Sequence, residues 1–254
     1  MKIFDKDAPT PKYLLAHGKT HTVLAIVLSL IVAPILSAAM IAGGGANLVS
    51  TSISKLGWQN EMLPVVYVWG LYNLALFAYM LKLALDSGNY KKGCKSFFYT
   101  LTALGCLILL VGISVPFISD DIPKHVLMRQ IHNVFATVGF LTFVIIIIAL
   151  TVTTYFRNRL QALISTGLTA FFIITGVFAV LCVNTPEKAT FITAAVQMYI
   201  FSMIHVLAGC QYFLNRFLPN EESYLHTCVD KSESKLGCDN PSDGDIAEFT
   251  ETTE

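Results

Sequence analysis

The sequence predicts an all-α integral membrane protein, a bundle of six transmembrane helices with both the N-terminus and the C-terminus in the cytoplasm. Three observations predict it: the composition, six apolar runs of membrane length, and an uneven distribution of Lys and Arg. Hydrophobic residues make up 54% of the chain and charged residues only 13%. A soluble globular domain carries roughly 25% charged residues, so the composition indicates a lipid environment.

The six apolar runs define the expected helices. Crossing ~30 Å of hydrocarbon at 1.5 Å per residue takes about 20 residues, and a helix satisfies its own backbone polar groups in lipid. The runs that reach this length cover residues 22–43, 63–85, 97–116, 133–155, 160–183 and 191–214. The connections between them are short, so we expect consecutive helices to be antiparallel neighbours.

The positions of Lys and Arg predict the orientation, because basic loops tend to stay on the cytoplasmic side. With a cytoplasmic N-terminus, thirteen bases lie inside: Lys2, Lys6, Lys12, Lys19, Lys82, Lys91, Lys92, Lys95, Arg157, Arg159, Arg216, Lys231 and Lys235. Only four lie outside: Lys55, Lys124, Arg129 and Lys188. An odd number of spans would break this pattern.

Three regions follow from the same patterns. Residues 1–21 form a cytoplasmic N-terminal segment, residues 22–218 the transmembrane domain, and residues 219–254 a cytoplasmic tail. The tail is acidic and poor in apolar residues, so it is expected to be disordered. The bases are scattered over separate loops and not clustered on one element, which argues against a nucleic-acid partner.

Two kinds of residue are expected to shape the bundle. Pro34 lies inside the first run and predicts a kink, because proline removes a helical hydrogen bond. Small residues let helices approach closely in membranes. Ala39 with Gly43 on the first helix, and Gly105 with Gly112 on the third, are the candidate contacts.

Polar residues inside the predicted spans are candidates for a ligand-binding face. Gln197, Phe201 and His205 recur every four residues, so they share one face of the sixth helix. Asn73 is placed at nearly the depth of Gln197 by counting from the outer surface, and Trp69 lies near the outer boundary. The alternative is that Asn73, Gln197 and His205 only form interhelical hydrogen bonds that stabilise the bundle.

The external loops hold a candidate metal site. Asp120, Asp121, His125 and His132 offer the oxygen and imidazole ligands that zinc or manganese accepts. Their spacing fits no established zinc motif, and acidic residues in such loops commonly bond turn or helix-end amides instead. No cofactor is expected: His132 and His205 are too far apart along the membrane normal to share a haem, and Lys82 is too close to a membrane surface for a buried retinal linkage.

Short motifs resemble a known family. The segment Ser52-Ile-Ser-Lys-Leu-Gly57, the second helix with Trp69-Gly70 and Asn73, and the stretch from Gly112 to Pro116 followed by His132-Asn133 resemble the DRAM/Frag/Sfk-type six-helix membrane proteins and their bacterial relatives. The resemblance covers roughly residues 20–215. It implies six spans with cytoplasmic termini and a link to autophagy, lipid-anchor remodelling or lipid asymmetry. It supplies no catalytic residues, and Lys55 stands where family members often have an acid.

Three functions follow as hypotheses. The first is a nonenzymatic bundle in the plasma membrane or an endomembrane that binds a lipid or small amphiphile, or regulates a membrane-protein partner or forms a homo-oligomer. The second is a membrane hydrolase with a metal at the external face. The third is a proton-coupled transporter that uses His205 with Asn73 and Gln197.

Overall fold

The structure is a computed structural model that describes residues 3–4, 11–45, 52–118, 122–183 and 193–218. Residues 1–218 form one compact unit. The predicted tail over residues 219–254 lies outside the described residues.

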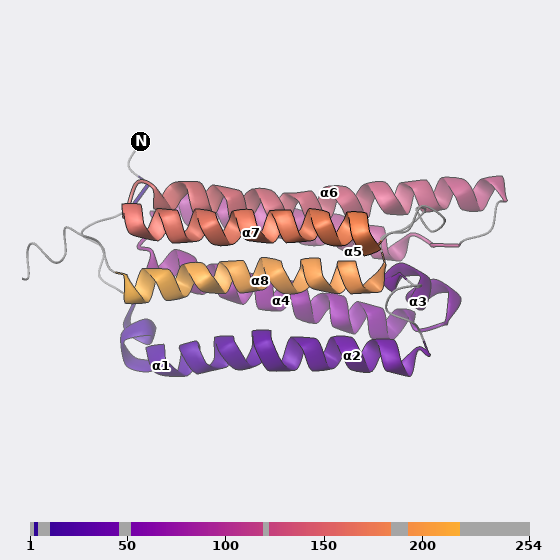
Figure 1. The fold of residues 1–254 in the computed structure, drawn as a ribbon, viewed down its shortest axis with the longest axis horizontal. Helices are drawn as coiled ribbons and strands as arrows, with labels where there is room; N and C mark the ends of the chain where they lie inside the picture. The colour runs from indigo at the N-terminus through magenta and orange to yellow at the C-terminus, as the bar shows by residue number, and fades with distance from the viewer. Residues whose placement is uncertain (1–2, 5–10, 46–51, 119–121, 184–192, 219–254) are drawn as a thin grey trace, which may run out of the picture. The chain divides into compact units, whose positions relative to one another are not determined.

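The unit is a helical bundle, and the six predicted spans are confirmed over the described residues (Figure 1). The elements are α1 (Lys12–Val27), the π-helical turn η1 (Leu28–Val32), α2 (Ala33–Gly43), α3 (Ile53–Gln59), α4 (Leu63–Ser87), α5 (Lys92–Ser114), α6 (Pro123–Thr154), α7 (Arg159–Val183) and α8 (Ala194–Phe217). The first span consists of α1, η1 and α2 in succession. The chain is therefore a multi-pass membrane protein.

The two ends of the bundle are called the α3 end and the Asp86 end. The α3 end holds α3 and the start of α4, α6 and α8, and the Asp86 end holds the start of α1 and the last turns of α4 and α8 (Figure 1). Helices α4 and α8 run in the same direction, because Trp69 meets Phe201 near one end and Asn215 bonds the Ala84 carbonyl near the other.

Two helices begin about ten residues earlier than predicted. The first starts at Lys12, inside the segment 1–21 that was expected to precede the membrane domain, and α6 starts at Pro123. Hydropathy alone places both starts too late, because polar residues dilute these first turns. In α1 the early turns are held by packing, since Leu14 lies against Leu83 and Tyr212.

The first span departs from α-helical geometry just before Pro34. The turn over Leu28–Val32 is π-helical, which is a common response where proline removes an i→i−4 hydrogen bond. Ala39 and Gly43 are both exposed, so no close helix contact forms at them among the described residues.

Glycines form the close contact between α5 and α6. A Cβ atom added at Gly105 would lie 3.1 Å from Thr142 Cγ2, and one added at Gly112 would lie 3.1 Å from the backbone nitrogen of Ala136. One added at Gly139 would lie 2.6 Å from Leu109 Cγ and 3.0 Å from the Leu109 backbone nitrogen. The predicted role of Gly105 and Gly112 is confirmed, and Gly139 adds the tightest point of this α5–α6 seam.

Candidate functional site

A cavity of about 550 Å³ lies at the α3 end. Its walls come from α4 and α8 on one side and from α5 and α6 on the other, and α3 also lines it. Cavities of 300–1,000 Å³ are typical of small-molecule sites. The two tightly packed helix pairs therefore enclose a space of ligand size where they separate.

The far wall of the cavity is aromatic and aliphatic. Leu74, Leu109 and Phe140 line it there. One turn further along α4 and α6, the buried rings of Phe77 and Phe143 meet edge to face with centroids 5.0 Å apart. This ring pair belongs to the packed core next to the cavity, toward the middle of the bundle.

The side formed by α6 is less enclosed. Thr137 and Leu141 line the cavity and are also exposed, with Leu141 showing 49% of its surface. Over the described residues, these α6 side chains therefore reach from the cavity wall to the outer surface of the bundle.

Gln197 fixes α3 to α8 at the polar side of the cavity. Its side-chain oxygen accepts a hydrogen bond from the Ile53 backbone nitrogen at 2.7 Å. Ser52 caps the same end of α3, since its hydroxyl accepts from the Lys55 backbone nitrogen at 3.0 Å. Because the Gln197 oxygen is used in this way, its Nε2 group retains two N–H donors beside α3.

Ser54 and His132 form the second polar pair of the cavity. Ser54 Oγ lies 2.7 Å from His132 Nε2, and His132 Nδ1 lies 3.1 Å from the carbonyl oxygen of Val115. A carbonyl only accepts, so Nδ1 carries the proton, and in the neutral imidazole Nε2 then accepts from the Ser54 hydroxyl. His132 is 4% exposed and packs edge-on against Phe117.

Trp69 contributes an apolar wall. Its Nε1 donates to Ser37 Oγ at 2.8 Å, and Ser37 in turn donates to the Ala33 carbonyl. Its ring contacts Phe201 edge to face with centroids 5.2 Å apart. The indole N–H is thus already paired within the bundle, and Trp69 contributes its ring to the cavity wall.

The four predicted ligand-binding residues do not all meet at the cavity. Trp69 and Gln197 line it, whereas Asn73 and His205 are not among its lining residues. The prediction that Asn73 and Gln197 share a depth is wrong. Trp69 is level with Phe201, so Asn73, one turn past Trp69, lies two turns beyond Gln197 and close to the level of His205.

Asn73 and His205 are both buried between helices. Asn73 donates to the Trp69 carbonyl at 2.8 Å within its own helix. His205 is 0% exposed, and neither ring nitrogen has a hydrogen-bond partner among the residues that the structure describes. A neutral imidazole always has one N–H to donate, so this is an unsatisfied polar group in the core.

Two of the four predicted metal ligands, Asp120 and Asp121, lie outside the described residues. Of the others, His125 lies two turns before His132 on α6, and both ring nitrogens of His132 are engaged by Ser54 and Val115. Within the described ranges, no three His, Cys, Asp or Glu side chains are grouped as metal ligands would be.

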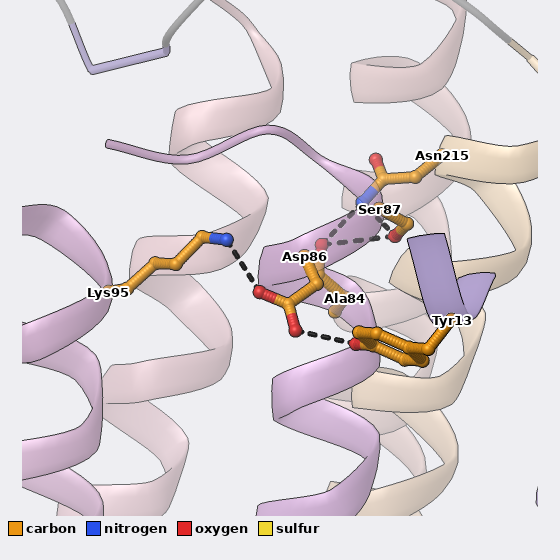
Figure 2. Close-up of polar contacts among 6 residues, drawn as sticks. All are labelled: Tyr13, Ala84, Asp86, Ser87, Lys95 and Asn215. Carbon is orange, nitrogen blue, oxygen red and sulfur yellow. Dashed lines mark hydrogen bonds and ion pairs between the residues drawn. The ribbon is translucent and has the colours of Figure 1, made fainter. Parts of the chain in front are cut away.

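The Asp86 end is a different kind of polar region, shown in Figure 2. The Asp86 carboxylate accepts a hydrogen bond from Tyr13 on α1 at 2.5 Å and forms an ion pair with Lys95 on α5, also at 2.5 Å. Asn215 on α8 donates to the Ala84 carbonyl at 2.8 Å and to the Ser87 hydroxyl. These contacts tie four helices together.

The turn regions at this end extend the network. Arg157 donates to the Asn215 side-chain oxygen at 2.5 Å, and Gln161 bonds the same oxygen. The Tyr90 hydroxyl lies 2.6 Å from Thr153 Oγ1. Burial raises the pKa of Tyr90 to about 12, although Thr153 and the Arg157 guanidinium act to lower it, so the phenol stays neutral and serves as a hydrogen-bonding group. Burial has the opposite effect on the pKa of Arg157, which it lowers, because in each case it disfavours the charged form.

Ser54 is the site residue that sequence reasoning did not single out. It belongs to the Ser52-Ile-Ser-Lys-Leu-Gly57 segment, which carries the family resemblance, but no helix was expected there. The signal available was a serine after the first span and a histidine before the fourth, both at the same predicted membrane surface.

No family model, curated protein or solved structure matches this chain. The roles of its residues therefore rest on their own geometry.

Proposed function

We propose that the protein holds the apolar part of a lipid or a small amphiphile in the cavity at the α3 end. The observation that carries this proposal is the cavity itself: about 550 Å³ between two packed helix pairs, with walls that include Trp69, Leu74 and Phe140. Helix interiors elsewhere in the bundle are closely packed. A cavity with apolar walls in a lipid environment therefore favours an apolar occupant.

The arrangement of polar groups fits an amphiphile. Most of the polar groups that line the cavity lie toward α3, among them Ser52, Ser54 and Gln197, while Thr137 lies on the α6 side. The opposite wall, toward Phe77 and Phe143, is apolar. An occupant with one polar end would place that end near α3 and its hydrocarbon toward the middle of the bundle, because buried polar groups need hydrogen-bond partners.

The proposal also includes an orientation, with the α3 end on the non-cytoplasmic side. At the Asp86 end the described bases are Lys12, Lys19, Lys82, Lys91, Lys92, Lys95, Arg157, Arg159 and Arg216, against Lys55, Lys124 and Arg129 at the α3 end. This imbalance supports a cytoplasmic Asp86 end. An impermeant reagent that labelled a cysteine at position 91, and not one at position 124, from outside intact cells would reverse it.

The test of binding uses palmitic acid carrying a diazirine on its chain, photolysed with the full chain in lipid nanodiscs. Crosslinks to α4 and α8 peptides that line the cavity are expected. Gly70→Leu places a side chain in the cavity, since a Cβ at Gly70 meets only Ile113 Cδ1 at 3.4 Å. We expect it to weaken the crosslinking by at least about tenfold, equivalent to 1.4 kcal/mol of binding free energy.

The matched control is Gly167→Leu on α7. Gly167 is exposed and has open space around its Cα, so the same substitution there adds a side chain on the lipid-facing surface. Crosslinking at the cavity should stay at the wild-type level. Crosslinks spread evenly over lipid-facing helices, and equal in both variants, would show that the cavity does not select a lipid.

A further inference from the structure

We propose that Ser54 and His132 form a nucleophile and general-base pair that cleaves the ester of a long-chain acyl lipid. This inference rests on the proposed function, because the cavity must bring the ester to Ser54. It adds a reaction to a binding site, without any metal.

The pair has the geometry that activation of a serine requires. A base must lie within hydrogen-bond reach of the nucleophile and be oriented by a third group. Ser54 Oγ is 2.7 Å from His132 Nε2, and the Val115 carbonyl holds His132 Nδ1 at 3.1 Å. The carbonyl fixes the tautomer that leaves Nε2 free to take the serine proton.

Burial keeps the imidazole in place. His132 is 4% exposed, and the Phe117 ring packs against it with centroids 5.2 Å apart. Both Ser54 and His132 nevertheless line the cavity. A hydrogen bond with only a structural role can lie anywhere in the core, whereas a nucleophile and its base must border the space that the substrate occupies.

Gln197 is the group best placed to stabilise negative charge on the ester oxygen. Its oxygen is bonded to the backbone nitrogen of Ile53, the residue adjacent to Ser54. Gln197 and Ser54 line the same cavity, so the Nε2 donors of this carboxamide are the ones we assign to the oxyanion. A donor aimed at the developing oxyanion commonly contributes ~100-fold or more to the rate.

The reaction balances with a lipid ester and water. Ser54 Oγ attacks the acyl carbonyl carbon while its proton passes to His132 Nε2. The bond between that carbon and the ester oxygen breaks, and His132 returns the proton to the departing alcohol. In the second step His132 takes a proton from water, and the resulting hydroxide attacks the acyl carbon. The bond between that carbon and Ser54 Oγ breaks, His132 returns the proton to Oγ, and the fatty acid is released.

The experiment treats the full chain in nanodiscs with a long-chain alkyl fluorophosphonate and locates the adduct by peptide mass spectrometry. We expect the adduct on Ser54 in the wild-type chain and its loss in Ser54→Ala. His132→Asn keeps a donor at the position of Nδ1 for the Val115 carbonyl but removes the base, and should slow labelling by at least about 100-fold. Hydrolysis of methylumbelliferyl oleate should follow the same order.

Ser114→Ala is the matched control. Ser114 is also at the α3 end, but its hydroxyl pairs with Tyr67 at 2.5 Å and does not line the cavity. Labelling and hydrolysis should equal those of the wild type. The position of the adduct in the wild-type chain needs no variant, so a variant that misfolds does not weaken the test.

Palmitate crosslinking separates the two proposals. A wild-type chain that is crosslinked at the cavity but gives neither an adduct on Ser54 nor ester hydrolysis overturns the dyad and leaves binding intact. Absence of crosslinking overturns the binding function itself. An adduct that persists in Ser54→Ala places the nucleophile elsewhere and also overturns the dyad.

Discussion

The two ends of the bundle solve the problem of polar groups in a membrane protein in opposite ways. At the Asp86 end, charged and polar side chains from several helices meet one another directly, and Asp86, Lys95, Tyr13 and Asn215 all have partners. At the α3 end, polar side chains border a cavity of about 550 Å³. At the Asp86 end the polar side chains bond one another, whereas the α3 end leaves space for a second molecule.

The difference suggests a division between stability and function. Interhelical hydrogen bonds in membranes each contribute modestly, roughly 0.6 kcal/mol on average, but the Asp86 end has several around one ion pair. A cavity costs packing contacts that the rest of the bundle must offset. We therefore expect substitutions at the Asp86 end to change stability most, and substitutions at the α3 end to change binding most.

Asp86→Ala is expected to have the largest effect on stability. It removes the partner of both Lys95 and Tyr13, whereas the Asp86 and Lys95 side chains are only 12% and 23% exposed. Removing one partner of a fully buried ion pair costs ~3–5 kcal/mol; because Lys95 keeps some contact with solvent, we expect about 2–3 kcal/mol. A lower thermal midpoint in detergent would measure it.

Lys92→Ala is the control for that substitution, because Lys92 is exposed one turn before Lys95 on the same helix. Its thermal midpoint should stay near the wild-type value. Equal midpoints for Asp86→Ala and the wild type would mean that the polar network at this end contributes little to the stability.

A pair of Gly→Ala substitutions gives a smaller effect and compares the packed seam with the cavity. At Gly139 the new Cβ would lie 3.0 Å from a backbone nitrogen of α5, so the helices must separate. Overpacking outweighs the gain in helix propensity, and we expect a net loss of about 1–2 kcal/mol.

At Gly70 the same change meets only a side-chain methyl at 3.4 Å. The gain in helix propensity should then dominate and raise the stability by up to about 1 kcal/mol. Opposite shifts in the two thermal midpoints are the expected result. A similar loss in both variants would mean that the space beside Gly70 is not available to a side chain.

The fold was predictable because hydrocarbon thickness sets helix length and leaves few alternatives. Six spans and the Gly105 and Gly112 contact followed from apolar runs and small residues alone. The early starts of α1 and α6 did not, because they depend on tertiary packing such as Leu14 against Tyr212. Helix α3 was not predicted, since seven residues with one cap give little periodic signal.

The candidate site was predicted only in part. Gln197 was identified as a polar residue inside a predicted span and Trp69 as an aromatic residue near the outer boundary, and both line the cavity. Ser54 was not identified, because its significance depends on His132, 78 positions away in the chain. The predicted depth of Asn73 in the membrane was also wrong. Counting from predicted helix ends placed Asn73 at nearly the depth of Gln197, whereas the contact between α4 and α8 places it two turns further on.

His205→Met tests the boundary between the two regions and should have the smallest effect. His205 lies in the middle of α8, is fully buried, and within the described part of the chain has no partner for either ring nitrogen. Replacing an unsatisfied polar group by an apolar side chain of similar volume removes a desolvation penalty, and the flexible methionine adapts to the available space. We expect the thermal midpoint to rise, by up to about 1 kcal/mol of unfolding free energy. A fall instead would mean that the imidazole is hydrogen-bonded in the membrane, for example to an internal water.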